Sequence, residues 1–173
     1  MQARAGARRQ GEVGRGLVLV ICTANVCRSP LAAALLLHRL HREGYTAIRV
    51  ESAGTHVTLP APLTPYTRRV LVERGFAVGG HRARQVTPGH LRRADLILVM
   101  EAAHAEHVAH VAPDVRSRTH LLSELGGSEY DIHAPYRGSL WAHRLLAEEM
   151  AGLVEAGWPR VIAWLAHSTS RSR

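Results

Sequence analysis

A short strand-loop-helix pattern near the N-terminus constrains the fold more than any other feature of this sequence. Residues 17–21, LVLVI, form an unbroken apolar run, which is typical of a strand buried on both faces of a sheet. Ser29 and Pro30 follow as a typical helix start, and a helical pattern continues through LAAALLLHRLHRE to Gly44. We therefore expect a strand, a loop of a few residues, and a helix with Ser29 as its N-cap.

The same alternation of strand and helix continues along the chain. Three further strands are predicted at IRVESAG (48–54), ADLILVM (94–100) and THLL (119–122). Thr64-Pro65 and Thr87-Pro88 each indicate a helix start, and EAAHAEHVAHV is typical of another helix. After a loop over residues 123–138, a helix is expected from 139 to about 156, with Pro159 breaking or kinking it.

Strands that alternate with helices favour an α/β fold. We predict three layers, in which a four-stranded parallel sheet carries helices on both faces. In such sheets the active site lies beyond the carboxyl ends of the strands, which is where Cys22 falls.

The length of 173 residues corresponds to one domain, expected over residues 17–167. Residues 1–16 are read as a disordered basic arm and residues 168–173 as a disordered tail. No apolar run reaches the ~20 residues of a membrane span, and no signal-peptide core follows the basic N-terminus. We expect a cytoplasmic protein that has no membrane partner.

The formal net charge of +8 would favour acidic partners. Four arginines of the basic arm contribute to it, however, and aromatic residues make up only 5% of the chain. No nucleic-acid-binding motif is present, so no specific nucleic-acid partner is expected.

Two cysteines, Cys22 and Cys27, lie in the loop CTANVCR. The first N–H groups of a helix bind anions, and Arg28 at the helix start can bind two phosphate oxygens. The same surroundings stabilise a thiolate, to which Ser29 can donate a hydrogen bond. A thiolate beside bound phosphate indicates phosphoryl transfer through a phosphocysteine. The alternative is a buried structural cysteine near a helix end.

Several segments together resemble one known family. VLVICTANVCRSP resembles the signature of the low-molecular-weight protein tyrosine phosphatases, a family that includes one group of arsenate reductases. SAGT (52–55), HRARQVT (81–87), ADLILVME (94–101) and DIHAPYRGS (131–139) resemble family segments in the same order. The resemblance spans residues 17–166 and implies the flavodoxin-like fold of these phosphatases, with a phosphotyrosine-bearing protein as the substrate.

The resemblance also implies roles for individual residues. Cys22 would be the nucleophile and Arg28 would hold the phosphate. Asn25 would shape the loop through Ser52 and His81. The whole phosphate-binding loop would comprise Thr23, Ala24, Asn25, Val26, Cys27, Arg28 and Ser29.

Cys27 matches the second thiol of the family, which can form a reversible disulfide with the nucleophile. Such a disulfide would protect Cys22 from irreversible oxidation.

The chain departs from the family at the general acid. The family protonates the leaving oxygen with the aspartate of an Asp-Pro dipeptide, and this chain has Ala134-Pro135 there. His133 and Asp131 are candidate substitutes, and Tyr136 matches an aromatic residue of the substrate cleft. Three hypotheses follow: an altered but working phosphatase, a slow phosphatase restricted to activated substrates, and a protein that mainly traps phosphotyrosine.

Other chemistries have less support. His104, His107 and His110 recur every three residues, but the third is rotated away from the first, so a solvated helix face is expected rather than a metal site. The proposed chemistry requires no metal or organic cofactor. Arsenate reduction coupled to thioredoxin needs cysteines after Cys27, and none is present. Arsenate reduction with an external thiol stays open.

Overall fold

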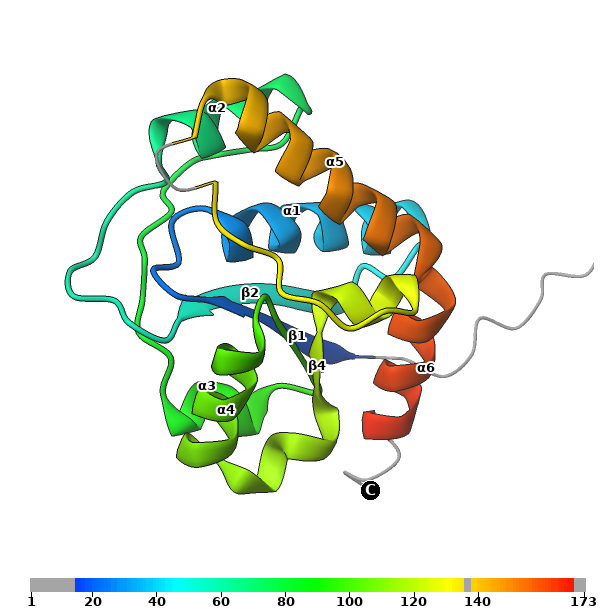
Figure 1. Cartoon of the computed structure of the whole chain (residues 1–173). Helices are drawn as coiled ribbons and strands as arrows, with labels where there is room; N and C mark the ends of the chain where they lie inside the picture. Colours follow the sequence, from blue (N-terminus) through cyan, green and yellow to red (C-terminus); the bar gives the residue numbers. More distant parts are fainter. Residues whose placement is uncertain (1–14, 136–137, 170–173) are drawn as a thin grey trace, which may run out of the picture.

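A four-stranded parallel sheet lies at the centre of the molecule, here described from a computed structural model that covers residues 15–135 and 138–169 (Figure 1). The strand order is β2-β1-β3-β4. The bounds are Gly16–Cys22 for β1, Ile48–Gly54 for β2, Leu96–Val99 for β3 and Thr119–Leu121 for β4. The predicted parallel sheet of four strands is confirmed.

Helices cover both faces of this sheet, as the alternating pattern predicts. Figure 1 shows α1, α2 and α5 on one side of the strands and α3 and α4 on the other. The helices are α1 (Arg28–Arg42), α2 (Pro65–Glu73), α3 (Pro88–Arg93), α4 (Ala102–Val111), α5 (Leu140–Ala156) and α6 (Trp158–Thr169). Two short 3-10 helices, η1 (Pro113–Arg118) and η2 (Leu122–Gly126), flank β4. No helix among the described residues is both long enough and apolar enough to span a membrane.

The unbroken apolar run of β1 is explained by burial on two sides. Val18 and Val20 pack into the core on the α1 side of the sheet. Leu19 and Ile21 point the other way and pack with Val108 of α4. Because successive side chains of a strand alternate between faces, a strand buried on both faces needs apolar residues at every position.

The proline-based helix starts behave as predicted at two of three positions. The Thr64 hydroxyl accepts from the backbone N–H of Thr67 at 3.4 Å, and the Thr87 hydroxyl accepts from the N–H of His90 at 3.2 Å. The expected N-cap role of Ser29 is wrong. Helix α1 begins at Arg28, two residues before Pro30, the expected first helical residue, and the Ser29 hydroxyl instead takes part in the site described below.

The predicted break near Pro159 is confirmed. Helix α5 ends at Ala156, Gly157 follows it, and α6 begins at Trp158 with Pro159 in its first turn. Proline is tolerated there because the first N–H groups of a helix have no intrahelical acceptor.

The order of the strands places a crevice at the end of β1. The chain runs from β1 to β2 on one side and returns to β3 on the other side of β1. Parallel sheets bind ligands where the direction of winding reverses in this way, outside the carboxyl ends of the strands. Residues that directly follow β1 and residues that directly follow β3 therefore lie close together at this crevice.

Candidate active site

A cavity of about 860 Å³ lies beyond the carboxyl end of β1 and combines two segments that the sequence singled out. The loop after Cys22 forms one part of its wall, and Ala134 with Pro135 forms another. The lining residues are Cys22, Thr23, Ala24, Val26, Cys27, Arg28, Thr64, Tyr66, Ala134, Pro135, Gly138, Ser139 and His143.

The loop between β1 and α1 is tightly curled. Cys22 is the last residue of β1 and Arg28 is the first of α1, and both are at most 5% exposed. Asn25, midway between them, has a positive φ of 56°, a conformation that asparagine tolerates better than most residues. The loop can therefore reverse direction within five residues.

Asn25 is held by four hydrogen bonds. Its side-chain amide donates to Ser29 Oγ at 3.0 Å and to Ser52 Oγ at 2.9 Å. Its side-chain oxygen accepts from the backbone N–H of Arg84 at 3.1 Å. Its backbone carbonyl accepts from His81 Nε2 at 2.7 Å. The structure thus brings together Asn25, Ser52 and His81, the three residues expected to shape the loop.

Gly54 lets the chain after β2 approach this loop closely. A Cβ atom at this position would lie 2.4 Å from the carbonyl oxygen of Thr23, so only glycine fits. The backbone N–H groups of the next two residues, Thr55 and His56, donate to the carbonyls of Cys22 and Thr23, each at 2.9 Å. The SAGT segment thereby fixes the base of the loop.

The two cysteines of the loop have different surroundings. Cys22 Sγ lies 3.0 Å from Ser29 Oγ, within hydrogen-bonding distance for a sulfur atom. Burial raises the pKa of the Cys27 thiol above its ordinary value. Both thiols are free. Cys27 therefore stays a neutral thiol over a wider pH range than an exposed cysteine.

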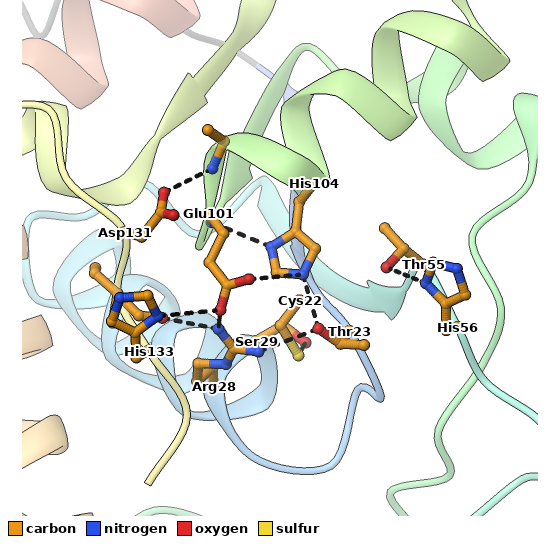
Figure 2. A network of polar contacts seen from close by, with 12 residues as sticks. Cys22, Thr23, Arg28, Ser29, Thr55, His56, Glu101, His104, Asp131 and His133 are labelled. Carbon is orange, nitrogen blue, oxygen red and sulfur yellow. Dashed lines mark hydrogen bonds and ion pairs between the residues drawn. The ribbon is translucent and has the colours of Figure 1, made fainter. Parts of the chain in front are cut away.

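The Arg28 guanidinium is fixed on two sides. Its Nη1 atom donates to the Glu101 carboxylate and, at 2.8 Å, to the carbonyl oxygen of Ile132. Its Nη2 atom donates to Thr23 Oγ1 at 3.2 Å. Figure 2 shows Glu101 and Thr23 against the same guanidinium. Because these contacts fix the plane of the group, Arg28 is oriented before any ligand binds.

His104 contacts both Glu101 and Thr23, two of the residues that hold Arg28. Its Nδ1 atom accepts from the backbone N–H of Glu101 at 3.1 Å, and its Nε2 atom lies 2.9 Å from Thr23 Oγ1. The side chain is buried, and this burial lowers the pKa of His104 to about 4. The expectation of a solvated histidine face is thus wrong for His104, because the first turn of α4 faces the site. The described residues contain no group of three or more potential metal ligands.

Neither candidate substitute for the general acid lines the cavity. Asp131 Oδ1 accepts from the backbone N–H of Ala102 at 2.8 Å, at the start of α4. The His133 side chain is 79% exposed, and its Nδ1 atom lies 3.9 Å from Glu101 Oε1. No aspartate or glutamate is among the lining residues in the described part of the chain. Tyr136 lies outside the described residues.

Two ring side chains of the wall were not anticipated from the sequence. The Tyr66 and His143 rings meet at 5.4 Å between centroids and at 64°, an edge-to-face arrangement. His143 Nδ1 donates to the carbonyl oxygen of Ser139 at 3.0 Å, which fixes the ring in the first turn of α5. Both residues lie near the start of a predicted helix, and this position was the only feature of the sequence that could have suggested their place in the cavity wall.

Comparison with known proteins shows to which family the chain belongs. The model of the family "Low molecular weight phosphotyrosine protein phosphatase" matches residues 17–166. The chain belongs to this family. It is a hydrolase of the protein-tyrosine-phosphatase type, as its resemblance to the family implied.

Two similar proteins carry tyrosine-phosphatase names, and a third is named an arginine phosphatase. The probable low molecular weight protein-tyrosine-phosphatase EpsP of Ralstonia nicotianae is 35% identical over 146 residues, covering 84% of this chain and 96% of that protein. The crystal structure of the tyrosine phosphatase Wzb from Escherichia coli K30 in complex with sulphate has a TM-score of 0.75 at 30% identity, covering 85% of this chain and 99% of that one. A protein-arginine-phosphatase of Geobacillus stearothermophilus is 29% identical over 139 residues, covering 80% of this chain and 90% of that protein.

Proposed function

We propose that this family member cleaves protein phosphotyrosine through a phosphocysteine at Cys22. The observation that carries the proposal is the shared cavity of Cys22 and a pre-oriented Arg28 at the start of α1. A helix N-terminus and a fixed guanidinium both favour a dianionic phosphate over neutral groups. Location in the cytoplasm is part of the proposal, because the reaction needs Cys22 as a free thiol, which reducing compartments maintain.

The proposed reaction has two steps. The Cys22 thiolate attacks phosphorus, the S–P bond forms, the bond from phosphorus to the tyrosyl oxygen breaks, and the departing phenolate takes its proton from solvent. Water then attacks phosphorus and the S–P bond breaks, which restores the thiolate and releases inorganic phosphate, with one proton of the water remaining on the phosphate and the other passing to solvent. The Ser29 hydroxyl, 3.0 Å from Cys22 Sγ, can donate a hydrogen bond to the thiolate in both resting and product states. Arg28 and the loop amides would stabilise the charge on the transferring phosphoryl group.

Protonation of the leaving oxygen is the step for which the described part of this site has no evident acid. The position expected for the acid is Ala134, whose methyl group has no proton to give. Loss of a general acid typically lowers the rate by about 10²–10⁴-fold, and the loss is greatest for poor leaving groups. We therefore propose an enzyme whose rate depends steeply on the leaving group, with trapping of bound phosphotyrosine as the limiting case.

The ring pair of Tyr66 and His143 supports an aryl substrate. Aromatic rings attract one another in offset or edge-to-face geometries, at about 0.5–1.5 kcal/mol beyond simple area burial. These two rings line the same cavity as Cys22, so a phenyl group attached to a bound phosphate has an aromatic surface beside it. Because one relative is named an arginine phosphatase, a phosphoarginine peptide is the appropriate comparison substrate.

The test is turnover of p-nitrophenyl phosphate, of a phosphotyrosine peptide and of a phosphoarginine peptide, with Cys22→Ser as the blank. The proposal predicts turnover of the nitrophenyl ester, much slower turnover of the phosphotyrosine peptide, no preference for the phosphoarginine peptide, and no turnover of any substrate by Cys22→Ser. Full activity of Cys22→Ser would overturn the role of the cysteine. Preference for the phosphoarginine peptide would overturn the substrate class while leaving the phosphocysteine in place.

A further inference from the structure

The hydrogen bonds of His104 determine which of its ring nitrogens carries the proton. The backbone N–H of Glu101 can only donate, and it points at His104 Nδ1 at 3.1 Å. Nδ1 is therefore unprotonated, and in the neutral ring the proton must be on Nε2. The ring is neutral at ordinary pH because burial lowers the pKa of His104 to about 4. His104 consequently donates to Thr23 Oγ1, at 2.9 Å.

The Thr23 hydroxyl oxygen receives a second donor from Arg28. Arg28 Nη2 lies 3.2 Å away, and a guanidinium has no acceptor. Figure 2 shows the Thr23 side chain joined to both His104 and Arg28. A hydroxyl oxygen has two lone pairs and one proton, so two donors occupy both lone pairs. The Thr23 proton must then point away from His104 and Arg28, and Thr23 lines the cavity beside Cys22.

We propose that the Thr23 hydroxyl is a fixed hydrogen-bond donor to one oxygen of the bound phosphoryl group, and that His104 is the residue that positions it. The inference rests on the proposed function for the identity of the ligand. The Thr23 hydroxyl would thus be a further hydrogen-bond donor to phosphate, besides the backbone amides of the loop and the Arg28 guanidinium. Since Thr23 cannot turn its proton toward either neighbour, the donor is oriented without loss of entropy when phosphate binds.

Binding of inorganic phosphate to the Cys22→Ser protein tests the donor without turnover. We expect Thr23→Val, which keeps the shape and removes the hydroxyl, to raise the dissociation constant about 10–100-fold, the usual effect of one hydrogen bond to a charged group. Thr23→Ser keeps the hydroxyl and should stay within about threefold of the parent. Equal affinities of the Val and Ser variants would overturn the proposal, whatever the turnover of the native protein.

The role of His104 requires a variant that separates positioning from helix capping. His104→Asn retains a side-chain oxygen that can accept from the Glu101 N–H, but it is too short to reach Thr23. We expect this change to weaken phosphate binding about 3–10-fold when Thr23 is present and to have no further effect in Thr23→Val, because contacting residues are not additive. The same loss in both backgrounds would show that His104 only supports α4, and would overturn its positioning role.

Discussion

Ala134 and Cys22 line the same cavity, and the side chain that Ala134 contributes from the late loop is only a methyl group. In the half of the site that we propose binds phosphate, Asn25 and Arg28 are both held by hydrogen bonds. The half that should protonate the leaving oxygen lacks a carboxyl group. We therefore predict that phosphate binding and leaving-group protonation are separable in this chain, and each can be tested by itself.

Restoring the carboxyl group should restore the missing step. We predict that Ala134→Asp raises kcat/KM for a phosphotyrosine peptide by about 10²-fold or more, and raises it less for p-nitrophenyl phosphate, whose leaving group needs little protonation. Ala134→Asn is the matched control, because it has the same shape without the acidic proton. Equal gains for Asp and Asn, or no gain for either, would show that Ala134 does not occupy the position of the acid.

His133 is expected to be dispensable for proton transfer. Its ring is 79% exposed, stands 3.9 Å from Glu101 and does not line the cavity. We predict that His133→Gln changes kcat/KM by less than about threefold for both good and poor leaving groups, as surface substitutions usually do. A loss confined to the phosphotyrosine peptide would instead identify His133 as the substitute acid.

Tyr66 should act on the aryl group and not on the phosphate. Its ring meets that of His143 in the cavity wall. We predict that Tyr66→Ala raises KM for a phosphotyrosine peptide about 3–10-fold, which corresponds to the loss of one aromatic pair. The inhibition constant of inorganic phosphate should not change, and Tyr66→Phe should behave as the native protein. A parallel weakening of phosphate inhibition would indicate damage to the loop instead.

His104 should make the stability of the fold depend on pH. Its pKa is about 4 in the folded chain and about 6.5 when unfolded, so between these values the unfolded chain binds more protons. The free energy of unfolding should therefore rise as pH increases from 4 to 6.5, by at most about 3 kcal/mol from this group. Urea unfolding across that range should show a shallower rise for His104→Asn. Parallel curves for the two proteins would contradict the assignment.

The sequence predicted what depends on local pattern. The run LVLVI, the Thr-Pro helix starts and the loop CTANVCR each carry their signal within a few residues, and the sheet follows from their alternation. A serine before proline is a common helix cap, so local pattern predicts that role for Ser29, whereas in the fold its hydroxyl meets Cys22 and Asn25.

Contacts between segments far apart in the chain could not be predicted from the local sequence pattern. Glu101 and His104 join a loop that lies 73 and 81 residues earlier in the chain, at Arg28 and Thr23 respectively. The strand order explains the meeting, since β3 lies beside β1 and both end at the crevice. The pairing of Tyr66 with His143 likewise depends on how α2 packs on α5. Spacing along one segment carries no information about either contact.

The most direct test of the account is the dependence of kcat/KM on the acidity of the leaving phenol, measured over a series of substituted phenyl phosphates. For the proposed mechanism this ratio reports the steps up to formation of the phosphocysteine. With Ala134 in place of the acid, we predict a steep fall in kcat/KM as the pKa of the phenol increases, and a flatter dependence for Ala134→Asp. A flat dependence in the native protein would mean that another group protonates the leaving oxygen, and would contradict the account.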